Sequence, residues 1–172
     1  MNKNIKFENK IIDLLNETDD KTIENYLIPV YLYVNCNSNK FNKVPTNIEE
    51  VVKWCGLKPN AHKGKSNDKI KNVLNYLKDK NVIDFDINLN TVRSKEVFYM
   101  TYTEKKYNIT NISIEHILKM INLDVEGVIN GRFMTYYCYA VITKDPINIK
   151  FEDMDYRTFL KYRNEYLKLL VN

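Results

Sequence analysis

The chain has 172 residues, 44% of them hydrophobic, and a formal net charge of +4 at pH 7, which suits one large domain or two small ones with a packed core. Its three cysteines (Cys36, Cys55 and Cys138) are far apart, which excludes a disulfide framework and a paired-cysteine metal site, and its longest apolar run, 26–34, is far shorter than the ~20 residues of a membrane span. Because the N-terminus mixes charged with apolar residues, unlike a signal peptide, we expect a cytoplasmic protein without disulfides, bound metal or membrane partner.

Residues 1–21 are expected to form an N-terminal arm, a short strand followed by a short helix, because apolar residues recur from Ile5 onward. A longer helix then begins, with Thr22 as its expected cap and a wide apolar face up to Val34. Pro29 lies inside this pattern, so we expect a kink there or a late start near Asn25.

The next stretch has the pattern of a helix-turn-helix. Thr46 and Glu49 have the spacing of a capping box, which predicts a short helix that ends at Gly56. A basic loop follows, and then a longer helix over about 66–80. Its apolar residues have the spacing of a helix with one buried face: Ile70, Val73, Leu74 and Leu77.

After Asn81 the period of the apolar residues changes from 3.6 to two. Alternating residues in 82–89 and again in 97–102 predict two strands joined by a polar turn, a β-hairpin. A first helix, a short helix, a basic helix and a hairpin follow one another in the order of a winged helix. The sequence therefore predicts an α+β, mostly helical fold in which 22–102 form a winged helix-turn-helix DNA-binding domain.

Residues 103–172 are expected to form a helical C-terminal unit. The pattern predicts a short helix from Ser113, a tyrosine-rich helix over about 125–144 and a short strand at 147–151. A last helix is expected over 156–170, with these residues inside: Phe159, Leu160, Tyr166, Leu167 and Leu170. One interpretation is a dimerisation unit. The other is a second, wingless copy of the same fold, because 132–144 resembles 26–37.

Positive charge is concentrated on one segment of the chain. Between Lys58 and Lys80 there are seven lysines and two aspartates, a balance of +5 against +4 for the whole chain, so all other residues sum to −1. Lysines neutralise phosphates and asparagines pair with adenine edges in the major groove. The predicted DNA contacts, facing outward or at the hairpin turn, are Lys63, Lys65, Asn67, Lys69, Lys71, Asn72, Asn75, Lys78, Arg93 and Lys95.

Signals for catalysis are weak. His62 and His116 are isolated, and the common glycine-rich nucleotide motifs and the nucleophile-elbow motif of hydrolases do not occur in the sequence. Asp84 and Asp86 share one strand face, as a metal-dependent nuclease requires, but a solvent-facing side of the hairpin explains them more simply. We therefore predict a protein that is not an enzyme and has no cofactor.

Several of these features together resemble a known group of proteins. These features are the tyrosine- and leucine-rich first helix, the Pro45-Thr46 start, the Lys/Asn-rich third helix and the entry to the hairpin at 81–84. They resemble the winged-helix N-terminal domains of replication initiators and replisome organisers from plasmids and phages of low-GC Gram-positive bacteria. The resemblance covers about 23–102, and the loop at 57–65 is longer than the usual turn of such helix pairs.

The resemblance implies sequence-specific binding of double-stranded DNA by a homodimer, at a replication origin or a transcriptional operator, with replication proteins as further partners. The alternative is a protein-interaction module, a phage or plasmid inhibitor of a host factor that keeps the scaffold without binding DNA. The DNA-binding protein and the interaction module would expose different surfaces. A DNA-binding protein needs Lys63, Lys65, Lys71 and Arg93 on one face, whereas an interaction module would expose an apolar, tyrosine-rich patch.

Overall fold

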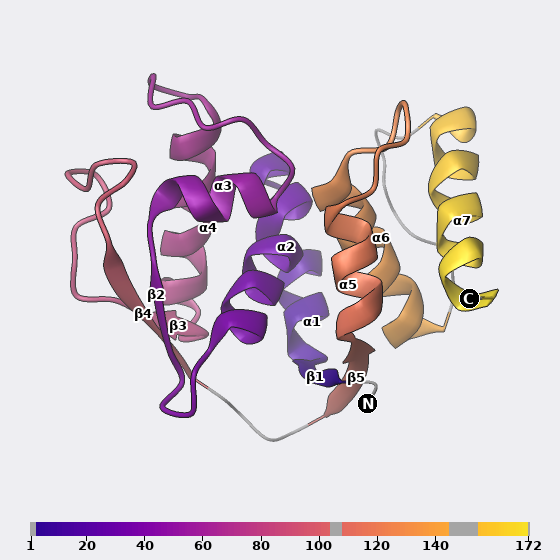
Figure 1. The fold of residues 1–172 in the computed structure, drawn as a ribbon, viewed down its shortest axis with the longest axis horizontal. Helices are drawn as coiled ribbons and strands as arrows, with labels where there is room; N and C mark the ends of the chain where they lie inside the picture. The colour runs from indigo at the N-terminus through magenta and orange to yellow at the C-terminus, as the bar shows by residue number, and fades with distance from the viewer. Residues whose placement is uncertain (1–2, 104–107, 145–154, 172) are drawn as a thin grey trace.

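The computed structural model describes residues 3–103, 108–144 and 155–171 as a mixed α+β fold in which helices dominate (Figure 1). The α+β class expected from the sequence is confirmed. The elements in chain order are β1 (Asn4–Glu8), α1 (Lys10–Asn16), α2 (Lys21–Asn37), β2 (Lys43–Thr46), α3 (Ile48–Trp54), α4 (Ser66–Asp79), β3 (Ile83–Asp84), β4 (Phe98–Tyr102), β5 (Ile109–Ser113), α5 (Ile114–Ile121), α6 (Asn130–Thr143) and α7 (Tyr156–Val171).

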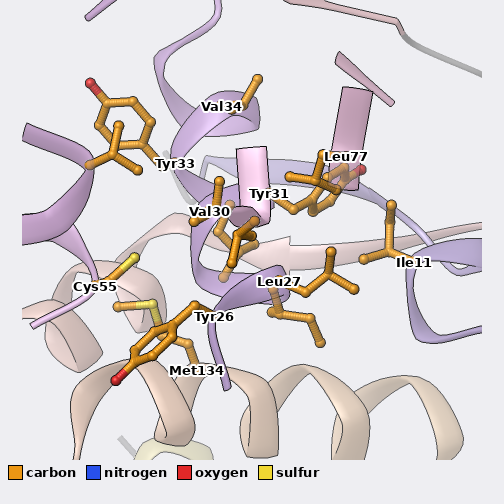
Figure 2. Close-up of a cluster of buried hydrophobic side chains, with 14 of the residues drawn as sticks. Ile11, Tyr26, Leu27, Val30, Tyr31, Tyr33, Val34, Cys55, Leu77 and Met134 are labelled. Atoms are coloured by element: carbon orange, nitrogen blue, oxygen red, sulfur yellow. The ribbon is translucent and has the colours of Figure 1, made fainter. Parts of the chain in front are cut away.

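Helix α2 is the centre of the core. Every residue in 26–34 is buried, including Pro29, because α4 packs on one side of α2 and α6 on the other. Figure 2 shows Ile11 of α1, Leu77 of α4 and Met134 of α6 gathered around it. The expected late start near Asn25 is wrong, since the helix begins at Lys21.

The caps of α2 and α3 differ from those expected by one or two residues. Asp20, and not Thr22, caps α2: its Oδ1 accepts hydrogen bonds from the backbone N–H groups of Thr22 at 2.7 Å and Ile23 at 3.3 Å. Asn47, and not Thr46, caps α3. Thr46 instead ends β2, where its hydroxyl is buried against the Tyr33 hydroxyl at 2.6 Å. In both places two residues able to cap a helix lie close together, and tertiary packing selects between them.

Helices α3 and α4 lie where the apolar spacing predicts them. All four residues of the predicted apolar stripe of α4 are buried. Gly56 ends the α3 turn with φ +76° and Asn81 follows α4 with φ +56°, both in the left-handed region that ends helices.

The predicted hairpin is present, but it is shorter than expected and belongs to a three-stranded sheet. β3 pairs with β4 in antiparallel fashion, with Ile83 opposite Tyr102. β2, which the sequence did not reveal, pairs with the other edge of β4, so the strand order is β2-β4-β3. The expected strand at 82–89 is wrong beyond Asp84, because residues 85–97 form a looped segment whose backbone is held by side chains of α4 rather than by a neighbouring strand.

A second, two-stranded sheet joins the N-terminal arm to the C-terminal half. β1 pairs with β5 in antiparallel fashion, with Lys6 opposite Asn111. The orders β1-α1-α2 and β5-α5-α6 are therefore alike, each a strand, a short helix and a long buried helix (Figure 1). The two long helices, which pack against each other, contain the segments whose sequences resemble one another.

The C-terminal helices deviate from expectation in two ways. α6 begins at Asn130 and not near Val125, while the predicted strand at 147–151 lies outside the described residues. Helix α7 is confirmed, but Leu167 and Leu170 are 43% and 52% exposed rather than inside. Tyr166 is buried as expected, and so is Tyr162; both pack on aromatic residues of α6.

Candidate nucleic-acid interface

The loop between α3 and α4, residues 57–65, is folded onto the first turn of α4. The Ser66 hydroxyl donates to the Lys58 carbonyl, the Asn60 backbone N–H donates to Asn67 Oδ1 at 2.9 Å, and the Gly64 N–H donates to Asp68 Oδ2 at 2.8 Å. These contacts use the polar side chains at the start of α4, so the lysines of the loop remain exposed.

Asn67 is buried, so it does not lie where a DNA contact would be expected. It was expected on the outer face of α4, but only 2% of it is exposed. While its Oδ1 accepts from Asn60, its Nδ2 donates to Ser94 Oγ at 2.8 Å. Asn67 therefore joins the 57–65 loop to the 85–97 loop and does not contact a ligand itself.

Lys71 and Lys78 also face the 85–97 loop. Lys71 Nζ donates to the Val92 carbonyl at 3.2 Å. Lys78 Nζ donates to the Phe85 carbonyl, lies 4.5 Å from the centre of the Phe85 ring and pairs with Asp84 Oδ1 at 3.0 Å. Hydrogen bonding from Lys78 lowers the pKa of the Asp84 carboxyl. Both lysines are only partly exposed and hold the loop against α4.

The remaining predicted contacts are more open. Asn75 is half-buried and Asn72 is exposed on α4. The exposed basic residues belong to the first turn of α4 and to the two loops that meet it, since Asn67 is hydrogen-bonded to Ser94, the neighbour of Arg93 and Lys95. We call this group the basic end: Lys58, Lys63, Lys65, Lys69, Arg93 and Lys95. Lys58 was not among the predicted contacts, although it begins the lysine-rich segment.

Helix α3 is hydrogen-bonded to the 85–97 loop at Ser94. The Glu49 backbone N–H donates to the Ser94 carbonyl at 3.1 Å. The two loops and the starts of α3 and α4 thus form one connected structure, in the upper left part of Figure 1, and the residues of the basic end belong to it.

The C-terminal end of α4 lies against α1 and has acidic residues near it. The Tyr76 hydroxyl donates to the Leu14 carbonyl at 3.1 Å, and Lys80 pairs with Glu17 at 3.1 Å, so α1 covers one flank. Asp79 and Asp86 are exposed nearby in the sequence. The exposed basic residues therefore lie in and around the N-terminal half of α4, together with the carboxylates of Asp68 and Glu96. The N-terminal residues of recognition helices in helix-turn-helix proteins contact base edges.

Other candidate sites are less convincing. His116 is half-buried with its Nδ1 2.6 Å from the Tyr137 hydroxyl, and burial lowers the pKa of its imidazole, which fits a packing role. His62 belongs to the exposed 57–65 loop. In the part of the chain that the structure describes, no three His, Cys, Asp or Glu side chains lie together as a metal site requires. No described helix has the length and apolar content needed to cross a membrane.

Comparison with known proteins found no matching family model, curated protein or solved structure. The geometry of the basic end and the arrangement of the elements around it are therefore the grounds for assigning a function.

Proposed function

We propose that this protein binds double-stranded DNA through its basic end, as a winged-helix protein of a plasmid or phage. The order α2-β2-α3-α4-β3-β4, with the sheet order β2-β4-β3, supports a winged helix in which α4 is the recognition helix. The 85–97 loop takes the place of the wing, and its contacts with Asn67 and Lys71 hold it beside α4.

The observation that carries this proposal is that exposed basic residues come from three separate stretches of chain that hydrogen bonds join at the start of α4. Lys63 comes from the α3–α4 loop, Lys69 from α4, and Arg93 from the loop after β3. Each is exposed, and no ion pair to a carboxylate is recorded for any of them within the described residues. A surface of this kind neutralises phosphates and gains free energy by releasing counterions from DNA.

The positions of the side chains indicate which of them would contact phosphates and which would contact bases. Lys65 and Lys69 lie at the start of α4, where they would flank the major groove and contact phosphates. Asn72, exposed one turn further along, would pair with base edges. Arg93 and Lys95 would contact the backbone or the adjacent minor groove.

The biological role that fits such a surface is occupancy of a replication origin or repression of transcription in the cytoplasm, with replication proteins as further partners in the first case. Neither role requires catalytic residues. The alternative of a pure interaction module could not use the tyrosines of α6, since Tyr136 and Tyr137 are 0% and 3% exposed; it would depend on the exposed apolar residues of α7, where Tyr156 is 74% exposed.

The test is a gel-shift assay of the purified protein against DNA from the region flanking its own gene, at several salt concentrations, with shuffled DNA of equal length as the control. We expect a discrete complex with the flanking DNA at low salt and a steep loss of affinity as salt rises. Failure to shift either DNA at low salt would refute the proposal. Equal affinity for the two DNAs would refute its sequence specificity.

A further inference from the structure

The C-terminal half of the chain repeats the plan of the N-terminal half. β1 and β5 pair through their middle residues, Lys6 and Asn111, and the outer pairs lie symmetrically about them. A two-fold axis at this central pair exchanges the two strands, and it relates the short helices α1 and α5 and the long helices α2 and α6 that follow them (Figure 1). The two halves therefore have the arrangement of two subunits in a two-fold dimer, joined in one chain.

The long helices of the two halves also correspond residue by residue. Aligning Tyr31 of α2 with Tyr137 of α6 superimposes two runs in which all residues but one are buried: 27–34 and 133–140. The Tyr31 hydroxyl accepts a hydrogen bond from the Glu8 backbone N–H in β1 at 3.1 Å, and the Tyr137 hydroxyl lies 2.6 Å from His116 Nδ1 in α5. Each tyrosine thus joins its long helix to the elements that precede it in its own half.

Helix α7 occupies the place in the second half that α4 occupies in the first. α4 packs on α2, and α7 packs on α6 through Tyr162 and Tyr166. Figure 1 shows α4 and α7 on opposite sides of the α2–α6 pair, each running from the upper part of the view downward. The N-terminal turns of the two helices therefore lie at the same end of the molecule, the end where the 57–65 loop lies.

The sequences of α4 and α7 match at the positions that matter for DNA binding. Each contains, at equal spacings, a basic residue, a hydroxyl residue, a lysine, a second basic residue and an asparagine. The aligned pairs are Lys65 and Arg157, Ser66 and Thr158, Lys69 and Lys161, Lys71 and Arg163, and Asn72 and Asn164. The same alignment matches buried residues with buried residues: Ile70 with Tyr162, and Leu74 with Tyr166. The outer face of α7 is therefore the counterpart of the outer face of α4.

We propose that α7 is a second DNA-contacting helix, so that one chain binds two neighbouring major grooves of the same duplex. Arg157 and Arg163, both exposed, would contact phosphates, and the exposed Asn164 would pair with base edges, as their counterparts in α4 do at the basic end. A homodimer supplies two recognition helices from two chains. Here the two halves of one chain would supply them.

The charge of α7 suits a polyanion. The helix contains four basic residues and one acidic residue, Glu165, which pairs with Lys168 at 2.6 Å near the C-terminal end. Arg157 and Arg163 lie nearer the N-terminal end, on the side of the molecule where α4 begins. Lysine and arginine side chains placed in this way release counterions from DNA when they neutralise phosphates.

Acidic neighbours make α7 a weaker contact than α4. Lys161 Nζ donates to the Glu126 backbone carbonyl at 3.0 Å, which places the 126–129 loop beside the helix. Glu126 and Asp155 are both exposed there, so the surroundings of α7 are less positive than the 58–80 segment. The second contact should therefore supply the smaller share of the salt dependence of binding.

A second contact presupposes DNA binding at the basic end, so the test must detect the two contacts separately. Hydroxyl-radical footprinting of the full-length protein on the DNA flanking its gene meets this need. We expect two protected patches on one face of the duplex, with centres about 10–10.5 bp apart, the spacing of successive major grooves. Light scattering of the same complex should give one chain per duplex, because a homodimer would also produce two patches.

Two charge-matched double variants assign the second patch. Arg157→Ala/Arg163→Ala removes two charges from the proposed contact, while Lys144→Asn/Lys168→Ala removes two exposed charges from the C-terminal ends of α6 and α7. At about 0.9 counterions per phosphate contact, the first should reduce the slope of log affinity against log salt by about 1–2 and abolish one patch. The control should reduce the slope by less than about 0.5 and keep both patches. Thermal melts of both variants should match wild type, since all four side chains are exposed.

Three results would overturn the second contact and leave DNA binding at the basic end intact. They are a single patch with wild type, two chains in a complex with two patches, and an Arg157→Ala/Arg163→Ala variant with the slope and footprint of wild type. Absence of any complex between wild type and DNA would overturn both proposals. Failure of the second contact is therefore distinguishable from failure of DNA binding itself.

Discussion

Replacing Asn67 with alanine tests whether this residue organises the two loops of the basic end. The substitution removes the bonds from Asn60 N–H to Oδ1 and from Nδ2 to Ser94 Oγ, 2.9 and 2.8 Å long. Each is worth about 1 kcal/mol net, and a buried donor left unpaired costs a further ~1–3 kcal/mol. We expect Asn67→Ala to lose about 3–5 kcal/mol of unfolding free energy, a large part of the ~5–15 kcal/mol typical of a domain.

The assay is urea unfolding followed by circular dichroism, beside a DNA-binding isotherm for the same protein. The matched control is Asn72→Ala on the exposed face of α4, which should change stability by less than about 0.5 kcal/mol. Asn72→Ala should weaken binding to the cognate site by ~1–3 kcal/mol and bind other sequences almost normally. Asn67→Ala should weaken binding to all sequences, because the loops lose their mutual support. Equal stability of the two variants would refute this account of Asn67.

Three further predictions concern the core, the lysines of α4 and the response to acid. Leu74→Ala removes a fully buried side chain from the α4 stripe and should cost ~2–5 kcal/mol in the same urea titration; a loss below about 1 kcal/mol would contradict the packing of α4. Lys69→Ala should reduce the salt slope of DNA binding by about one, whereas Lys71→Ala, which frees the Val92 carbonyl, should mainly lower stability; the reverse pattern would refute their assigned roles. His116 has a lowered pKa through burial, so below about pH 6.5 the unfolded chain binds a proton more readily than the folded one. Stability should therefore fall from pH 7 toward pH 5 less steeply in His116→Gln than in wild type, and identical pH profiles would contradict this.

The helices of the basic end could be predicted from local signals. The apolar residues of α4 recur at helical spacing, and Asn81 occupies the left-handed conformation that ends the helix. The strands β2 and β5 could not be predicted, because their partners lie far away in sequence: Pro45 opposes Tyr99, and Thr110 opposes Phe7. Such pairings depend on tertiary packing and leave little local pattern in four or five residues.

The residues of the candidate site, too, could be predicted only in part from the sequence. Exposed lysines such as Lys63 and Lys69 follow from charge and spacing alone. The burial of Asn67 does not, because a polar residue beside an apolar stripe normally faces solvent, and only the structure shows Asn60 and Ser94 around it. In α7 the spacing does not decide which apolar residues are buried: contact with α6 buries Tyr162 and Tyr166 and leaves Leu167 and Leu170 exposed.

The central claim, that DNA binds at the basic end, is tested most directly by the salt dependence of binding in two charge-matched quadruple variants. One replaces Lys63, Lys65, Lys69 and Arg93 with alanine. The other replaces Lys3, Lys6, Lys40 and Lys43, exposed residues in or next to β1 and β2 and outside the basic end, so both lose four positive charges. At about 0.9 counterions per phosphate contact, the first should reduce the slope of log affinity against log salt by about 3–4, and the second by less than about one. Equal reductions in the two variants would contradict the assignment of the DNA-binding surface to the basic end.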